Sequence, residues 1–425
     1  MTGLAWGILA AYLASALTGH GLDFLNRRHV LRTAGDAPAL PFGLKEPGLL
    51  RKTQAYTVAK QRLAGFGALA EQAAVLLFFY GGLLGWMDGW IHSWRLPFIP
   101  SMLLFFLLLF LAQTLLQLPL AWYRQFRLEA RFGFNTMSTG LWLADEAKGL
   151  LLGFLLLSAI VCAGSWLTVL FPTIWWLWIW GLGVLLSWVL MIAGPLWIAP
   201  WFNRFTPLPE SRLTDRIKTL LLQAGIRTDR VFSVDASRRS RHTNAYFTGI
   251  GRVKRIVLYD TLLESLEEPE VLAVLAHEAG HWKRRHALQR LGSTAAVGLV
   301  AAYAAYHVTS GNGLALAFGL ETASFAARLA LAGLLFQVAF FPLEPLFNAW
   351  SRRQELAADR FSAALTGSPD SLGSALVKLL RDNLANWAPH PWYAAFHYSH
   401  PPLLQRLAKL AEIKEGNVRQ AEKSV

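Results

Sequence analysis

The stretch "FIPSMLLFFLLLFLAQTLLQLPLAW", residues 98–122, carries no charged side chain over its whole length. A helix needs about 20 apolar residues to cross the hydrocarbon core of a bilayer, so this stretch predicts a transmembrane helix. Six further runs of this kind lie along the chain, at residues 3–22, 64–87, 149–171, 174–200, 291–310 and 323–347. The sequence therefore predicts an all-α polytopic membrane protein with seven transmembrane helices.

The composition agrees with a membrane location. Hydrophobic residues make up 54% of the chain, the mean hydropathy is +0.35, and charged residues make up only 16%, against about 25% in a soluble domain. The net charge of +13 admits nucleic-acid binding as an alternative, but the basic residues fall in loops between apolar runs, which is typical of a cytoplasmic leaflet. We therefore expect a lipid bilayer and no nucleic acid as partner. The single cysteine, Cys162, excludes an intrachain disulfide and a multi-cysteine metal site.

The distribution of basic residues predicts the orientation. The loop after the third run contains Arg124, Arg127 and Arg131, whereas "SGNGLALAFGLET" between the last two runs contains no basic residue. The loop after the first run is also strongly basic, with Arg27, Arg28, Arg32, Lys45, Arg51, Lys52, Lys60 and Arg62. By the positive-inside rule the N-terminus lies outside and the polar segments after the fifth and seventh spans lie in the cytoplasm. The first run lacks a basic start, so we expect a retained helix rather than a cleaved signal.

The polar segments divide the chain into five predicted parts. They are a five-helix membrane domain (1–200), a first cytoplasmic segment (201–290), the last two spans (291–348), a second cytoplasmic segment (349–411) and a flexible tail (412–425). The predicted membrane is the inner membrane if the host is bacterial, and the endoplasmic reticulum if it is eukaryotic.

The stretch "LAVLAHEAGHWKRRHALQ", residues 272–289, indicates metal chemistry within the first cytoplasmic segment. On a helix, His277 and His281 share one face and can bind one ion. Glu278 is rotated about 100° from His277, so it can act as a general base on a metal-bound water. Catalytic zinc usually takes three protein ligands. The best candidate for the third is Glu355 in "SRRQELAADRFS", because the last two spans return the chain to the same side of the membrane.

Asp359, four residues after Glu355, lies on the same helical face and can accept a hydrogen bond from the second nitrogen of a ligand histidine. Three alternatives stay open at this point: an ordinary surface helix with two histidines, a transporter with zinc as cargo or structural ion, and an inactive relative that acts as a scaffold. A transporter would favour ligands near the bilayer midplane, and these candidates lie outside the hydrocarbon.

Six blocks of the sequence, in this order, resemble the type-I CAAX prenyl protease family of membrane-integral zinc endopeptidases. The blocks are "ARFGFNTMST" (130–139), "APWFNRFTPLPESRL" (199–213), "HTNAYFTGIGRVKRIVLYDTLL" (242–263), "LAHEAGHW" (275–282), "SRRQELAADRFS" (351–362) and "HYSHPPLLQRL" (397–407). The resemblance implies one zinc ion per chain, a mostly helical cytoplasmic peptidase domain with a small β-sheet, and a water-filled chamber enclosed by the spans. It implies His277, His281 and Glu355 as zinc ligands, Glu278 as base and Asp359 as the partner of a ligand.

The same resemblance implies roles for residues around the metal. Asn244 and Ala245 match an edge strand on which an extended substrate pairs its backbone, a common mode of peptide recognition. The resemblance matches His400 to a histidine that stabilises the tetrahedral oxyanion, and Arg406 to a nearby structural or substrate-site arginine. His397 is a further candidate, with a packed histidine as the alternative.

Polar residues inside the spans are candidates for the wall of the chamber, because such residues normally face protein or water. They are Glu71, Gln113, Gln117, Gln337 and Glu344. Hydrogen bonding between helices is the alternative for the glutamines. The resemblance implies a peptide or protein substrate ending in a prenylated CAAX motif. Quality control of membrane proteins without prenyl specificity is the alternative function.

Overall fold

The structure is a computed structural model, and it describes residues 1–33, 47–227, 230–248 and 255–422. Within these ranges, seven helical segments are long and apolar enough to cross a membrane, which confirms the predicted number. Their principal helices are α1 (Gly3–Arg32), α2 (Pro47–Phe79), α4 (Phe98–Tyr123), α6 (Thr139–Leu170), α7 (Trp175–Ala193), α12 (His286–Ser310) and α14 (Phe325–Phe340) continuing into α15 (Glu344–Thr366). Lys45 of the first basic loop lies outside the described residues.

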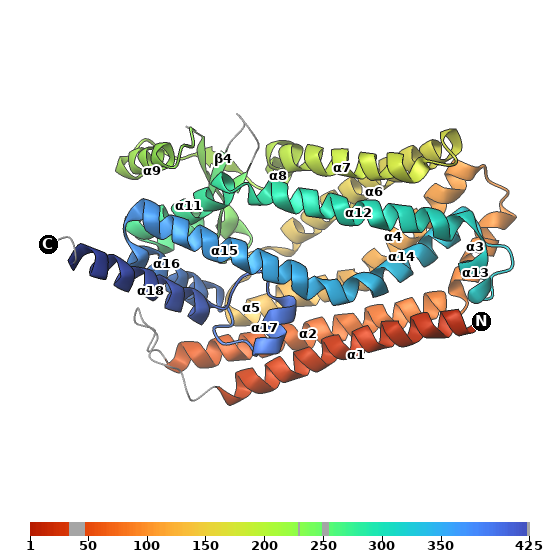
Figure 1. The fold of residues 1–425 in the computed structure, drawn as a ribbon, viewed down its shortest axis with the longest axis horizontal. Helices are drawn as coiled ribbons and strands as arrows, with labels where there is room; N and C mark the ends of the chain where they lie inside the picture. The colour runs from red at the N-terminus through yellow and green to blue at the C-terminus, as the bar shows by residue number, and fades with distance from the viewer. Residues whose placement is uncertain (34–46, 228–229, 249–254, 423–425) are drawn as a thin grey trace.

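The long helices run roughly along the longest axis of the molecule, and the polar elements gather at one end of it (Figure 1). The N-terminus and two short helices, α3 (Leu83–Ser93) and α13 (Gly313–Ala317), lie at the opposite end. Three spans are extended by short helical turns, namely η1 (Arg124–Glu129) and α5 (Ala130–Phe132) after α4, η2 (Gly194–Ile198) and α8 (Ala199–Phe202) after α7, and η4 (Phe341–Leu343) between α14 and α15.

The second span differs from its predicted limits of 64–87. Helix α2 ends at Phe79, and α3 begins at Leu83 after a tight turn. Gly82 adopts φ of +87°, a conformation that glycine adopts without the clash of a Cβ. The apolar run therefore contains the end of one helix and the start of another, which hydropathy alone does not separate.

A four-stranded sheet forms the centre of the polar end. Its strands are β1 (Phe205–Pro207), β2 (Val231–Val234), β3 (Ala245–Thr248) and β4 (Arg255–Tyr259), in the order β1-β2-β4-β3. Strands β2 and β4 are parallel, and the two outer pairs are antiparallel. β3 is therefore an edge strand of the sheet, and it contains Ala245, while Asn244 directly precedes it.

Helices surround this sheet and form the core with it. They are α9 (Arg212–Gln223), η3 (Ala236–Arg238), α10 (Asp260–Ser265), α11 (Glu268–Lys283) and α16 (Pro369–Asn383). Helix α17 (Pro391–His397) packs against α1 and α15, and α18 (Leu403–Glu422) packs against α15 and α16. The largest buried cluster joins α9, the strands and α11 through side chains such as Ile217, Ile256 and Leu275. The observed fold class, mostly helical with a small sheet, is the predicted one.

Helix α18 extends to Glu422, into the segment 412–425 for which the sequence predicted a tail. Leu410 is fully buried and Ile413 packs against the same cluster, so the apolar spacing continues past residue 411. Lys414 also pairs with Asp370 at the start of α16, at 2.7 Å. Residues 423–425 lie outside the described part of the chain.

Candidate active site

The helix that carries the histidine pair is fixed at its beginning by a capping box. Glu267 precedes α11, and the side chain of Glu270 accepts the backbone N–H of Glu267 at 2.8 Å. Glu270 also accepts from Lys378 Nζ at 2.8 Å and from Ser374 Oγ at 2.6 Å, both on α16. The first of these bonds satisfies a backbone donor that a helix start leaves free. The other two attach α11 to a neighbouring helix at the end remote from the histidines.

The third candidate ligand arrives on α15, which crosses α11 at close range. Gly280 makes this possible, since a Cβ at this position would lie 3.1 Å from the Cα of Ala358. Ser362 Oγ, one turn further along α15, donates to the carbonyl of Ala273 at 2.7 Å. The crossing therefore brings Glu355 opposite His277 and His281, although 74 residues separate Glu355 from His281 in the sequence.

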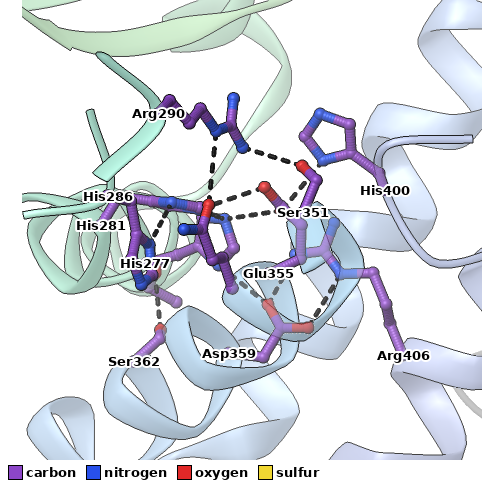
Figure 2. Close-up of polar contacts among 12 residues, drawn as sticks. His277, His281, His286, Arg290, Ser351, Glu355, Asp359, Ser362, His400 and Arg406 are labelled. Atoms are coloured by element: carbon purple, nitrogen blue, oxygen red, sulfur yellow. Dashed lines mark hydrogen bonds and ion pairs between the residues drawn. The ribbon is translucent and has the colours of Figure 1, made fainter. Parts of the chain in front are cut away.

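The three predicted ligands lie together, with their ligand atoms all within 4.8 Å of one another. The two Nε2 atoms of His277 and His281 are 3.2 Å apart. The Glu355 carboxylate lies 3.4 Å from His277 Nε2 and 3.3 Å from His281 Nε2 (Figure 2). Among the described residues this is the one group of at least three such side chains placed to hold a metal.

The spacing of these donors suits zinc. Four ligands arranged tetrahedrally at 2.0–2.1 Å from a zinc ion are separated by roughly 3.3–3.4 Å. The observed separations of 3.2, 3.3 and 3.4 Å are each close to such an edge, with Glu355 facing His277 through Oε2 and His281 through Oε1. Two imidazoles and one carboxylate also form a donor set typical of catalytic zinc, with a fourth position left for water. The residues therefore fit a zinc ion in both chemistry and distance.

Asp359 lies where the sequence predicts, behind one of the histidines. Its Oδ1 is 2.8 Å from His277 Nδ1, so it holds the ring with Nε2 directed at Glu355. Burial lowers the pKa of the His277 imidazole, but the hydrogen bonds to Asp359 and Glu355 outweigh this and raise the pKa to about 9. Without a metal, His277 is consequently protonated at neutral pH.

Arg406 is committed to Asp359. Its Nε and Nη2 donate to the two carboxylate oxygens at 2.9 and 2.6 Å (Figure 2). Such a two-point pair fixes the plane of the carboxylate as well as its position. Arg406 also lines the small cavity beside the histidines. The observed contact therefore gives Arg406 a structural part in the site.

His286 is a site residue that the sequence reasoning missed. It is buried, and its Nδ1 lies 2.9 Å from Nδ1 of His281. A continuous helix would turn a residue five positions after His281 to another face. Instead α11 ends at Lys283, and Arg285 adopts φ of +56° before α12 begins. The sequence signal for this contact was the presence of a third histidine in the stretch 272–289.

The remaining candidates surround a cavity of about 200 Å³ that borders His277 and Glu355. Glu278, His400, Asn244 and Ala245 all line it. Burial raises the pKa of the Glu278 carboxyl, and this outweighs the lowering by the neighbouring His277. His400 Nδ1 lies 2.9 Å from Glu355 Oε2, while its side chain is 63% exposed and thus open to a ligand. The candidate base Glu278, the candidate oxyanion donor His400 and Ala245 of the edge strand β3 therefore line the same cavity as His277 and Glu355.

A second, larger cavity of about 1070 Å³ lies among the spans. Glu71, Gln113 and Gln337 line it, as the chamber hypothesis expects, and so does His397. The alternative of hydrogen bonds between helices holds for two of the glutamines, because Gln113 donates to Glu71 at 3.4 Å and Gln117 donates to the same oxygen. In the part of the chain that the structure describes, the lining does not include Glu344.

Comparison with known proteins agrees with this geometry. The family model described as CAAX prenyl protease N-terminal, five membrane helices, matches residues 27–204, and the model for peptidase family M48 matches residues 207–414. The chain is 38% identical over 315 residues to the "CAAX prenyl protease 1 homolog" of Oryza sativa subsp. japonica, which covers 71% of each chain. It is 34% identical over 402 residues to the Arabidopsis thaliana homolog, which covers 88% of this chain and 91% of the relative.

Among solved structures, the crystal structure of S. mikatae Ste24p superposes with a TM-score of 0.87 at 27% identity. The match covers 96% of this chain and 99% of that one. The similarity therefore extends over both the spans and the polar end, and the matched proteins are proteases, which does not favour the transporter alternative.

Proposed function

Because the chain belongs to peptidase family M48 and is an integral-membrane metalloendopeptidase of the CAAX prenyl protease 1 kind, we propose that it cleaves membrane-associated peptides at one zinc ion held by His277, His281 and Glu355. The observation that carries this proposal is the set of donor separations, 3.2, 3.3 and 3.4 Å, among the three side chains. A bound zinc ion supplies Lewis acidity for the scissile carbonyl and for the attacking water.

Glu278 is the proposed general base. It follows ligand His277 directly and lines the same cavity, so its carboxylate can take the proton of the attacking water and pass it to the leaving amine. A carboxyl whose pKa is raised by burial accepts that proton more readily than a solvated one. Asp359 and Arg406 have a supporting task, which is to hold the His277 ring in the tautomer that leaves Nε2 free for the metal.

His400 is the proposed donor to the oxyanion. It borders the cavity on the side of Glu355, and its exposed ring can reach a substrate carbonyl. One well-placed donor of this kind contributes about 3–4 kcal/mol to transition-state stabilisation. Arg406 does not take a similar role, because two of its nitrogens donate to Asp359. Its proposed contribution to substrate binding is limited to the wall of the cavity.

The substrate backbone is proposed to add to the free edge of β3. Asn244 and Ala245 line the cavity, and β3 pairs with β4 on one side, which leaves its other side at the edge of the sheet. An extended peptide there would make main-chain hydrogen bonds, and pockets would select its side chains. Its scissile bond would then lie beside Glu278.

We assign the substrate to the class of C-terminal CAAX-type peptides that carry a prenyl group, which is the activity named for the matched relatives. Apolar residues such as Leu109, Leu329 and Val338 line much of the cavity among the spans, and this environment suits a prenyl chain. Glu71 would be water-accessible on the same wall, and a water-soluble thiol reagent should label a cysteine substituted for it. The alternative is a protease for membrane-associated proteins without prenyl specificity.

The proposed orientation follows the basic loops, with the N-terminus outside and the active site in the cytoplasm. In this arrangement residues 1–200 and 291–348 form the membrane part. Residues 201–290 and 349–411 together form the peptidase part, from which α18 continues to Glu422.

A peptide-cleavage assay tests the proposal. The purified full chain, loaded with zinc, is given a farnesylated CAAX peptide and the same peptide without the farnesyl group, with and without a chelator. Cleavage of the farnesylated peptide alone, abolished by the chelator, is expected. Equal cleavage of both peptides would support the alternative substrate class, and no metal-dependent cleavage of either would overturn the proposal.

A further inference from the structure

A groove of about 760 Å³ lies between the polar end of α1 and the adjoining part of α2. None of its lining residues belongs to the cavity at the histidine pair, so it is separate from the active site. α1 and α2 lie side by side along one edge of the molecule, away from the sheet (Figure 1). Several of its lining side chains are more than half exposed, so the groove opens on the surface of the molecule.

Four arginines line this groove, Arg27, Arg28 and Arg32 from α1 and Arg62 from α2. Arg27 reaches across to the neighbouring helix, since a Cβ on Gly65 would lie 3.9 Å from its Nη1. Within the described residues, none of the four makes an ion pair with a carboxylate. Asp23, the acidic residue one turn before Arg27, lines the cavity inside the spans and interacts electrostatically with Arg27. The groove thus contains three arginines, Arg28, Arg32 and Arg62, to which no carboxylate of the described residues is paired.

The rest of the groove is apolar and exposed. Phe24 and Leu31 on α1 are 55% and 58% exposed, and Phe66 and Leu69 on α2 are 64% and 57% exposed. On each helix these side chains repeat at intervals of three or four residues with the arginines, so they form one stripe per helix. Large exposed apolar side chains on a spanning helix face lipid tails. Guanidinium groups and lipid-facing aromatic residues therefore occur in the same groove.

We propose that this groove is a binding site for one anionic phospholipid. The arginines bind the headgroup phosphate, for which the planar, multiply donating guanidinium is well suited. The acyl chains lie along Phe24, Leu31, Phe66 and Leu69. Basic pockets between transmembrane helices are the sites at which anionic headgroups are recognised. The alternating positive and apolar lining matches a molecule that has an anionic headgroup and apolar chains, whereas a free phosphate ion would contact only the arginines.

Native mass spectrometry of the full chain tests this site. The protein is reconstituted with equal amounts of phosphatidylglycerol and phosphatidylcholine that carry identical acyl chains, and the retained lipids are counted. The wild type should retain phosphatidylglycerol preferentially. Each basic residue near an anionic headgroup contributes about a fivefold preference, so Arg28→Gln combined with Arg62→Gln should reduce the preference by about 25-fold.

A matched double substitution outside the groove distinguishes binding in the groove from a general effect of net charge. Arg51→Gln combined with Lys52→Gln removes the same two charges from exposed positions of α2 that do not line the groove, and should leave the preference within about twofold of the wild type. Arg28→Lys with Arg62→Lys should keep most of the preference, which excludes misfolding as the cause of a loss. A wild type without preference, or an equal loss in both glutamine pairs, would overturn the proposal. Displacement of the lipid by 10 mM inorganic phosphate would do so as well.

Discussion

Gly280 of α11 and Ala358 of α15 touch where the two helices that carry the proposed zinc ligands cross. A Cβ added to Gly280 would lie 3.1 Å from the Cα of Ala358 and 3.1 Å from the Cβ of Phe361. This contact is next to His281 and less than one turn from Glu355. The separation of the histidine pair from the carboxylate therefore depends on the missing side chain at position 280.

Gly280→Ala should weaken zinc binding at least tenfold, because the added methyl group forces α15 away from α11 by a few tenths of an ångström. Alanine stabilises a helix relative to glycine by about 1 kcal/mol, so a loss of zinc affinity in this variant would not result from a lower helix propensity. Gly292→Ala on α12 is the matched control, since its Cβ would meet nothing within 4 Å. Competition with a chromophoric chelator measures both affinities, and wild-type affinity in Gly280→Ala would contradict this account of the crossing.

Glu278→Gln should retain zinc and lose cleavage by a factor of about 10²–10⁴, because the amide cannot accept the proton of water. His277→Ala should lose both zinc and cleavage. The two variants are compared by zinc content and by turnover of the farnesylated peptide. Turnover of purified Glu278→Gln at the wild-type rate would exclude Glu278 as the base.

His286→Ala should weaken zinc binding about 10–100-fold, the usual effect of removing a partner that orients a metal ligand. The reason is the 2.9 Å contact between His286 Nδ1 and His281 Nδ1, which directs Nε2 of His281 at the metal site. His307→Ala, a histidine later on the same helix α12, serves as the control. Zinc dissociation rates decide the matter, and equal rates in the two variants would show that His286 does not orient His281.

Zinc affinity should fall as the pH is lowered. The pKa of His277 is about 9 in the metal-free protein, so below that pH a proton must leave Nε2 before zinc binds. Protonation of His277 should lower the apparent association constant of zinc about tenfold per pH unit below pH 9, and the constant should level off above pH 9. Titration in weakly buffered solution at pH 7 should release about one proton per zinc from His277. Affinity independent of pH between 6 and 8 would contradict the raised pKa.

Much of this architecture could be predicted from the sequence. Apolar run length predicts seven spans because the bilayer imposes a minimum length on each, and the i, i+4 histidine pair predicts two ligands on one helical face. Glu355 could be placed near His277 because a hairpin of two spans returns the chain to its starting side. These inferences depend on constraints that act locally or through the membrane.

Other features depend on tertiary contacts that no local pattern reveals. His286 reaches His281 only because the helix breaks at Arg285, and the end of α2 at Phe79 depends on the turn at Gly82. The commitment of Arg406 to Asp359 was also not predictable, since α18 and α15 are brought together by packing around Leu410. The groove between α1 and α2 likewise requires both helices to be in place.

The zinc content of the purified full chain tests the central claim most directly. Glu355→Ala is compared with Glu344→Ala, the same substitution at the start of the same helix α15. Elemental analysis after extensive dialysis should find about one zinc per chain in the wild type and in Glu344→Ala, and almost none in Glu355→Ala, because the third of three protein ligands is lost. One zinc per chain retained in Glu355→Ala would show that the carboxylate at 355 is not a ligand, and it would contradict the proposed metal site.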